Sequence, residues 1–191
     1  SVSELVDSNT RAIVPVHYAG ISADLEELEQ IVDAFEDLSM VEDNAHGLFG
    51  SHRGLPLGSF GRFSTLSFHE TKNFSCGEGG ALVINQEQDV SRAHVLYDKG
   101  TNRAAFLEGE VDRYTWIDQG SSFGMSDLLA GFLLGQLEER SQIMARRKDI
   151  FDQYHQSLSS LQERLGFQVP VVQEWQEPAY HMFYVLISDE A

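Results

Sequence analysis

The residues most able to do chemistry lie in one stretch, where an apolar run ends in a polar turn. Residues 66–68 form the run, residues 69–73 form the turn with Lys72 inside it, and a glycine-rich bend at 77–80 follows. Glycines there let the backbone approach a ligand closely. A lysine at a strand end can be partly desolvated, which favours the neutral amine that forms a Schiff base. Most lysines are only surface charges, but this setting predicts a cofactor-binding amine.

An acid and a histidine follow the preceding predicted strand. Asp43 comes directly after residues 39–42, and His46 follows three residues later. In an open parallel sheet the carboxyl ends of strands face the ligand crevice, although a helix cap or a turn would also explain Asp43. Pyridoxal phosphate enzymes combine such an acid, such a lysine and a glycine-rich bend. We therefore expect Lys72 to carry pyridoxal phosphate and Asp43 to keep its ring nitrogen protonated.

Alternating strands and helices are predicted to position these residues. Residues 11–17 favour a buried parallel strand, residues 25–35 an amphipathic helix capped by Ser22 or Asp24, and residues 39–42 the next strand. Together they predict a βαβ unit. The other predicted strands are residues 64–68, 81–84, 166–171 and 181–187. A helix is predicted over 86–99, an aperiodic stretch over 101–123, and a long helix from Ser126. The basic residues 146–148 of that long helix are predicted to form a solvated face.

Composition and charge exclude several classes of protein. The 191 residues, 42% of them hydrophobic, are enough for one sizeable core or a domain and a half. The net charge of −17 disfavours binding to nucleic acids or anionic membranes, and no apolar run approaches the ~18 residues of a membrane span. The single cysteine, Cys76, allows no intrachain disulfide, and no Cys and His cluster has zinc spacing. We expect a cytoplasmic protein without a metal site.

Three segments resemble the DegT/DnrJ/EryC1/StrS aminotransferases, which aminate nucleotide sugars. The segments are Val-Glu-Asp-Asn-Ala-His-Gly at 41–47, Ser-Phe-His-Glu-Thr-Lys-Asn at 67–73 and Gly-Glu-Gly-Gly-Ala-Leu at 77–82. The resemblance runs over nearly the whole chain and implies an α/β fold, the fold type I (aspartate aminotransferase-like) architecture with a mostly parallel sheet. Residues 1–125 would be the C-terminal portion of the cofactor-binding large domain. Residues 126–191 would be a long connecting helix and the beginning of a small α+β domain.

Other segments look most like one branch of that family, the dTDP-4-amino-4,6-dideoxygalactose transaminases. They are residues 99–103, 114–116 and 120–127. This likeness implies a transaminase that uses L-glutamate to aminate dTDP-4-dehydro-6-deoxy-D-glucose. It also implies deoxyamino sugar biosynthesis for lipopolysaccharide or enterobacterial common antigen, and a cytoplasmic homodimer with a shared active site.

The resemblance assigns roles position by position. It makes Lys72 the Schiff-base residue and the catalytic acid/base, and Asp43 the partner of the pyridine nitrogen. His46 stands where many members have a glutamine beside the cofactor ring oxygen. Ser67 matches a hydroxyl that contacts the cofactor phosphate.

A further phosphate contact is implied across the subunit boundary. Residues 122–127 resemble a loop that reaches the phosphate bound by the neighbouring subunit. Many members have asparagine at the position of Gly124, which has no side chain to offer. Ser122 or the backbone is therefore the candidate contact.

Two features of the family are missing from this sequence, and two other functions are considered for it. Family members are longer and have an upstream phosphate loop and a stacking aromatic residue that this sequence lacks, so we expect a fragment that is too incomplete to be active alone. A sugar dehydratase of the same family would carry histidine in place of Lys72, which argues against that function. A non-catalytic or regulatory fragment that acts through oligomerisation stays open as a function of another class.

Overall fold

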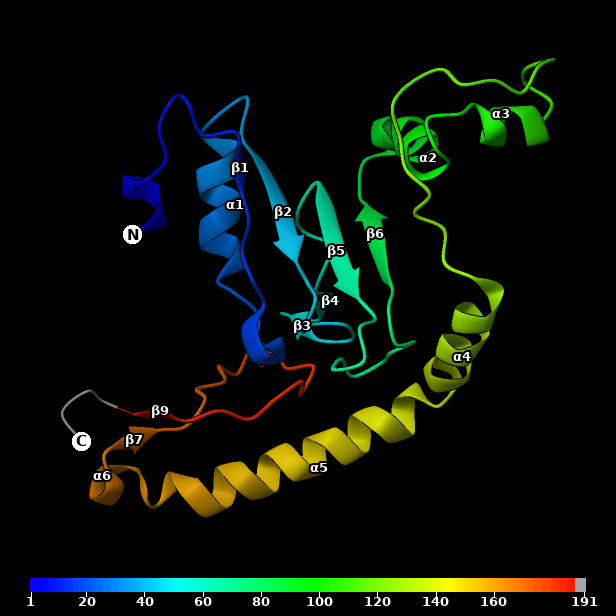
Figure 1. The fold of residues 1–191 in the computed structure, drawn as a ribbon. Helices are drawn as coiled ribbons and strands as arrows, with labels where there is room; N and C mark the ends of the chain where they lie inside the picture. The colour runs from blue at the N-terminus through cyan, green and yellow to red at the C-terminus, as the bar shows by residue number, and fades with distance from the viewer. Residues whose placement is uncertain (188–191) are drawn as a thin grey trace.

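The computed structural model describes residues 1–187, and its centre is a four-stranded sheet in the order β1-β2-β5-β6 (Figure 1). The strands are Ala12–Ile13 (β1), Ser39–Asp43 (β2), Phe63–Ser67 (β5) and Gly80–Ile84 (β6). β1, β2 and β5 run parallel, whereas β6 pairs antiparallel with β5. The predicted mostly parallel α/β sheet is therefore confirmed. Its carboxyl edge carries Asp43 and Ser67.

Helix α1, Leu25–Asp33, links β1 to β2 and completes the predicted βαβ unit. Asp24 rather than Ser22 is its N-cap, since the Asp24 side chain accepts the backbone N–H of Glu27 at 3.4 Å. The buried face of the helix packs on β2 and forms the first core cluster. That cluster consists of Leu25, Leu28, Ile31, Leu38, Met40 and Leu57.

A second core cluster joins the β5–β6 loop to helix α4, Asp127–Glu138. It consists of Phe68, Phe74, Cys76 and Leu133. Ser126 caps α4 by accepting the backbone N–H of Leu129, as the sequence predicts for the start of this helix. Helix α5, Arg140–Ser159, then runs past the carboxyl edge of the sheet, toward which β2 and β5 point (Figure 1).

Some predicted strands are much shorter in the structure. The strand predicted over 11–17 is reduced to β1 and one parallel bridge between Val16 and Asp43, because Pro15 has no N–H to donate. The strands predicted over 166–171 and 181–187 are reduced to β7, Phe167–Gln168, and β9, Leu186–Ile187, which pair antiparallel. Residues 188–191, the end of the predicted second domain, lie outside the described residues.

The predicted helices are divided. The helix over 86–99 is a 3-10 turn, Glu87–Asp89, followed by α2, Val90–Tyr97. The stretch predicted to be aperiodic contains a short helix, α3, Arg103–Leu107. The long helix from Ser126 breaks at Glu139 into α4 and α5.

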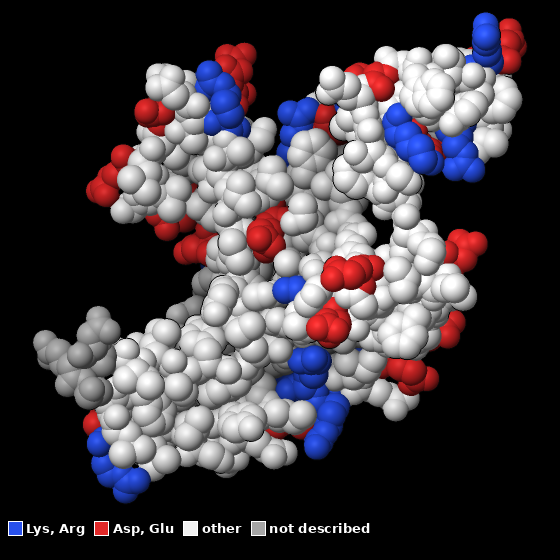
Figure 2. All heavy atoms as spheres, viewed as in Figure 1, with Lys and Arg blue, Asp and Glu red and all other residues white. Residues whose placement is uncertain are grey.

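The remaining elements are short. They are the 3-10 turns Val2–Glu4 and Tyr18–Gly20, the helix α6 at Gln162–Leu165, and a small antiparallel sheet of β4 (Leu55–Pro56), β3 (Ser51–His52) and β8 (Gln176–Glu177). Figure 2 shows acidic side chains scattered over the visible face and a group of basic side chains over α5. Among residues 1–187 no helix is long and apolar enough to cross a membrane.

Candidate active site

The loop that carries Lys72 joins β5 to β6 and is closed by backbone hydrogen bonds. The N–H of Phe68 donates to the carbonyl of Gly79 at 2.8 Å, which continues the β5–β6 ladder into the loop. Within the loop the N–H of Lys72 donates to the carbonyl of His69 at 2.9 Å and closes a tight turn. The Lys72 side chain is half-buried. The sequence is therefore right that Lys72 lies in a turn between an apolar strand and a glycine-rich bend.

Two side chains fix this loop to α4. Phe74 is 1% exposed and packs with Leu133 in the second core cluster. The side-chain amide of Gln136 accepts the N–H of Ser75 at 3.1 Å and donates to the Ser75 carbonyl. The Lys72 turn is thus held by apolar packing and by a two-way hydrogen bond from one helix.

Asp43 is the last residue of β2. Its backbone N–H donates to the carbonyl of Pro15 at 2.9 Å, and its carbonyl accepts the N–H of His17 at 3.1 Å. One carboxylate oxygen, Oδ1, accepts the N–H of Ala45 at 3.2 Å. Within residues 1–187 no hydrogen bond reaches Oδ2. Asp43 therefore has a fixed backbone and one carboxylate oxygen available for a ligand.

The residue before Asp43 is a buried acid that holds the neighbouring chain. Glu42 accepts hydrogen bonds from His17 at 2.9 Å and from the backbone N–H groups of Gly58, Phe60 and Gly61, each at 2.8 Å. Burial alone would raise the pKa of Glu42, but these hydrogen bonds hold the pKa below its ordinary value. Glu42 thereby anchors the glycine-rich passage that leads into β5.

His46 brings the predicted site residues together. Its Nδ1 accepts the N–H of Ala19 at 3.3 Å, and its ring stacks on His181 with centroids 4.2 Å apart and planes 25° apart. Burial and the positive charge of Lys72 lower the pKa of His46, and the carboxylate of Asp43 partly opposes this. Asp43 and Lys72 therefore both lie close enough to His46 to influence its charge.

His181 is a site residue that the sequence did not single out. Its Nδ1 lies 2.9 Å from Oδ1 of Asn73, the residue after Lys72. The amide nitrogen of Asn73 donates to the carbonyl of Ala179 at 2.6 Å. The Lys72 turn is therefore joined directly to a segment more than a hundred residues away along the chain.

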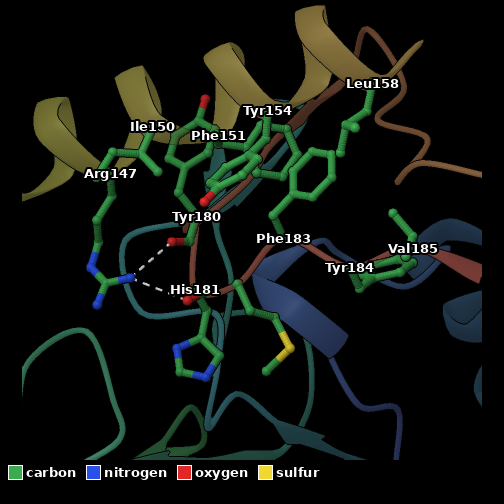
Figure 3. Close-up of a pocket in the computed structure, with 11 residues that line it drawn as sticks. Arg147, Ile150, Phe151, Tyr154, Leu158, Tyr180, His181, Phe183, Tyr184 and Val185 are labelled. Carbon is green, nitrogen blue, oxygen red and sulfur yellow. Dashed lines mark hydrogen bonds between the residues drawn. The ribbon is translucent and has the colours of Figure 1, made fainter. Parts of the chain in front are cut away.

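Arg147 holds the same segment from the other side. Its guanidinium donates to the carbonyls of Tyr180 at 3.2 Å and His181 at 3.1 Å (Figure 3). The side chain is half-buried, and burial lowers the pKa of its guanidinium. The prediction that residues 146–148 are a solvated face is therefore wrong for Arg147. Its spacing of four residues from the apolar Ile143 and Phe151 is the sequence signal that it faces inward.

A hollow of about 440 Å³ opens beneath α5 next to His181 (Figure 3). Aromatic rings line it: Phe183 lies edge-on to Phe151 with centroids 5.2 Å apart, and Tyr154 lies 5.5 Å from Phe183. This packing holds the C-terminal segment that carries His181 against α5, and the ring of His181 points away from that helix (Figure 3).

Among the described residues, no group of three or more His, Cys, Asp and Glu side chains is placed to hold a metal ion.

The two predicted phosphate contacts lie in different places. Ser67 ends β5 on the same edge as Asp43, is half-buried, and accepts the N–H of His69 at 3.3 Å. Ser122 is exposed and forms a bridge with Asp98 at the end of α2. Over the part of the chain that the structure describes, no hydrogen bond joins Ser122 to the other site residues. Its role toward a neighbouring subunit stays a prediction.

Comparison with known proteins gives one family. A model of the DegT/DnrJ/EryC1/StrS aminotransferase family matches residues 1–191. An uncharacterized protein of Methanocaldococcus jannaschii is 28% identical over 190 residues, which are 98% of this chain and 48% of that protein.

Solved structures agree with the family match. AtS13 of Actinomadura melliaura has a TM-score of 0.86 and 27% identity, over 99% of this chain and 51% of its own. The sugar aminotransferase CalS13 of Micromonospora echinospora has a TM-score of 0.86 and 25% identity over the same shares. Spr1654 of Streptococcus pneumoniae in its PLP form has a TM-score of 0.83 and 25% identity, over 98% of this chain and 50% of its own. The expected fold is confirmed, and the chain spans about half the length of these relatives.

Proposed function

The chain belongs to the DegT/DnrJ/EryC1/StrS aminotransferase family, and on that premise we propose that it carries the lysine-bearing part of a sugar transaminase active site. The enzyme would use pyridoxal phosphate to move an amino group from L-glutamate to a keto nucleotide sugar. The observation that carries this proposal is the convergence of Asp43, His46 and Lys72 at the carboxyl edge of the sheet. Ligands bind at that edge in open α/β sheets.

The residues present fit pyridoxal phosphate by their donor and acceptor types. Lys72 supplies the amine that would hold the cofactor covalently, and the free Oδ2 of Asp43 would accept the N–H of the pyridine ring. Because the Nδ1 of His46 already accepts a hydrogen bond, its Nε2–H would donate to the ring oxygen. The hydroxyl of Ser67 would donate to the phosphate. Ser122 is proposed for the phosphate bound by a neighbouring subunit.

The chemistry is divided between cofactor and protein. When bound, the cofactor supplies an electron sink for the carbanion formed at the substrate carbon. Lys72 would act as a general base and then a general acid, moving a proton between the substrate carbon and the cofactor carbon that flank the transferred nitrogen. Asp43 would hold the proton on the ring nitrogen, which would keep the ring electron-poor. A half-buried setting limits the water that would compete for these protons.

The specific sugar that we propose is dTDP-4-dehydro-6-deoxy-D-glucose. Support comes from the resemblance of residues 99–103, 114–116 and 120–127 to the transaminases that form dTDP-4-amino-4,6-dideoxygalactose. The corresponding pathway is deoxyamino sugar biosynthesis for lipopolysaccharide or enterobacterial common antigen, in the cytoplasm. Residues 1–125 and 126–191 are proposed to belong to the large and small domains of the enzyme.

A homodimer with a shared active site is part of the proposal. On α4 the apolar side chains of Leu128, Phe132 and Leu134 are 87%, 64% and 56% exposed, which supports an association surface. The same surface would serve the second candidate, a non-catalytic fragment that acts through oligomerisation. Labelling at Lys72 by the cofactor separates the two, since only the transaminase needs that amine.

The test is covalent labelling of the protein with pyridoxal phosphate. The chain is incubated with the cofactor, reduced with borohydride, digested and analysed by mass spectrometry. The wild type should carry the label on the peptide that contains Lys72, and Lys72→Ala should lose it. Lys99→Asn is the matched control, because Lys99 is exposed and has a positive φ of 62° that asparagine tolerates.

Two results would overturn the proposal. One is a wild-type chain that takes no label at saturating cofactor. The other is a label that persists in Lys72→Ala at the wild-type level, which would place the reactive amine elsewhere. Turnover of the keto sugar with glutamate, measured on the longer enzyme of which this chain would be a part, then tests the choice of substrate.

A further inference from the structure

The hydrogen bonds around Asn73 determine which nitrogen of His181 carries the proton. The amide nitrogen of Asn73 donates to the carbonyl of Ala179 at 2.6 Å, so the other end of the amide, Oδ1, is the acceptor that faces His181. Nδ1 of His181, 2.9 Å from that oxygen, must then be the donor. In the neutral ring this leaves Nε2 of His181 without a proton.

The imidazole of His46, which stacks on His181, carries its proton on the other type of ring nitrogen. Nδ1 of His46 accepts the N–H of Ala19 at 3.3 Å, which places the proton of the neutral ring on Nε2. The two rings stack with centroids 4.2 Å apart. Within residues 1–187 no hydrogen bond reaches the Nε2 of either ring. His181 thus has a free acceptor nitrogen, and the ring stacked on it has a free donor nitrogen.

Both rings are kept neutral. Burial first, and then the charges of Lys72, Arg147 and of His46 when that ring is protonated, lower the pKa of His181 to about 4. Burial and the charge of Lys72 also lower the pKa of His46. Near neutral pH each ring therefore has one protonated nitrogen, and its hydrogen-bond partner selects which.

Hydrogen bonds hold the backbone beside His181 in a strained conformation. Tyr180 has a positive φ of 51°, which is unfavourable for a bulky residue. The N–H of His181 donates to the carbonyl of Ala19 at 3.2 Å, and Arg147 donates to the carbonyls of Tyr180 and His181 (Figure 3). A strained conformation persists where several surrounding contacts fix it, which is often the case at functional sites. Here the contacts from Ala19 and Arg147 fix the orientation of the His181 imidazole.

We propose that Asn73 is a positioning residue that acts through His181: its side-chain amide fixes the Nδ1–H tautomer and so presents an unprotonated Nε2 beside His46. Because the Nε2–H of His46 would donate to the cofactor ring oxygen, the unprotonated Nε2 of His181 is the acceptor left for a ligand hydroxyl, which would donate to it. This role rests on the proposed function, because a nucleotide sugar supplies such hydroxyls. The tautomer itself is a property of the protein alone.

The test reads the tautomers directly, without cofactor or substrate. A long-range ¹H–¹⁵N NMR spectrum of the chain at pH 7.5 distinguishes protonated from unprotonated ring nitrogens, and His181→Gln and His46→Gln assign the signals. We expect the proton on Nδ1 of His181 and on Nε2 of His46. A wild-type spectrum with His181 protonated on Nε2 would overturn the proposal. That result would leave labelling at Lys72 unaffected, so the two proposals fail separately.

Variants then show whether Asn73 is the cause. Asn73→Asp keeps the accepting oxygen, so His181 should keep its Nδ1–H tautomer. Asn73→Ala removes the acceptor, and His181 should change to the Nε2–H tautomer. Asn102→Ala is the control, because among the described residues the side chain of Asn102 bonds only to the backbone of Arg113 and Thr115 in another loop. A folded Asn73→Ala with an unchanged His181 tautomer would refute the role; if that variant does not fold, the wild-type and Asn73→Asp spectra decide.

Discussion

His17 and Glu42 form a hydrogen-bonded pair with no exposed side-chain surface, and Glu42 directly precedes the proposed site residue Asp43. The Nδ1 of His17 accepts the N–H of Ala23 at 3.2 Å, so its Nε2–H donates to Glu42 across 2.9 Å. Since side chains alternate along a strand, Glu42 faces the interior while Asp43 faces the other side of β2. The buried pair therefore fixes the strand on which Asp43 is presented.

Replacing Glu42 by glutamine should destabilise the protein. Both carboxylate oxygens accept two hydrogen bonds each, and the NH₂ of glutamine would face two donors instead. Losing such charge-assisted bonds in a buried site costs about 2–4 kcal/mol. Urea unfolding followed by circular dichroism measures this change. The exposed Glu36→Gln is the control and should stay within about 0.5 kcal/mol of wild type. Equal stability of the two variants would contradict the anchoring role of Glu42.

Replacing Gln136 by leucine should loosen the Lys72 turn. The variant keeps the size of the side chain but removes both hydrogen bonds to Ser75, which are worth about 1–2 kcal/mol together. Hydrogen exchange should become faster at the Ser75 amide and in the rest of the loop over residues 68–79. Gln142→Leu is the matched control on α5, because Gln142 is exposed and, within residues 1–187, its side chain bonds only to Glu139. Unchanged exchange at Ser75 in the Gln136 variant would show that the hydrogen bonds from Gln136 are not needed to hold the turn.

The stability of the protein should fall on mild acidification because of His181. Its pKa is lowered from 6.5 to about 4 in the folded chain, first by burial and then by His46, Lys72 and Arg147. Between these two values the unfolded chain binds more protons, so the free energy of unfolding decreases as the pH falls. The loss begins near pH 6.5 and is complete near pH 4.

Urea titrations at several pH values measure this dependence. His181→Gln removes the titrating group and should flatten the slope between pH 6.5 and 4. Acidic groups such as Glu42 add their own loss of stability at lower pH, and comparison with the variant separates the two. The same slope in wild type and variant would mean that His181 titrates alike in folded and unfolded chains.

Short sequence patterns correctly predicted the elements that form between residues close together in the sequence. The period of Leu25, Leu28 and Ile31 predicted the buried face of α1, and Asp24 was one of the two caps predicted for it. β2 differs from its prediction by one residue, Asp43. The Lys72 turn was also foreseen, because glycines and an apolar run mark a loop between strands.

The rest depended on contacts that are distant in the sequence. β1 is short because Pro15 breaks its ladder, and the division at Glu139 has neither glycine nor proline to announce it. Asp43, His46, Ser67 and Lys72 came from motifs, whereas His181 and Arg147 did not, because their roles arise from folding the C-terminal segment onto the Lys72 turn. The spacing of Arg147 from Ile143 and Phe151 indicates that it faces inward, but no local pattern encodes its contact with the C-terminal segment.

The distance along the chain between Asn73 and His181 has a consequence for folding. They are 108 residues apart, whereas Ser67 and Gly80, which pair beside the Lys72 loop, are separated by 13. Three doublings of loop length add about 2 kcal/mol to the entropy cost of closure. The β5–β6 hairpin can thus form early from local contacts, and the His181 contact closes late. We expect the Lys72 turn to stay folded in partly unfolded states in which the contact between Asn73 and His181 is already lost.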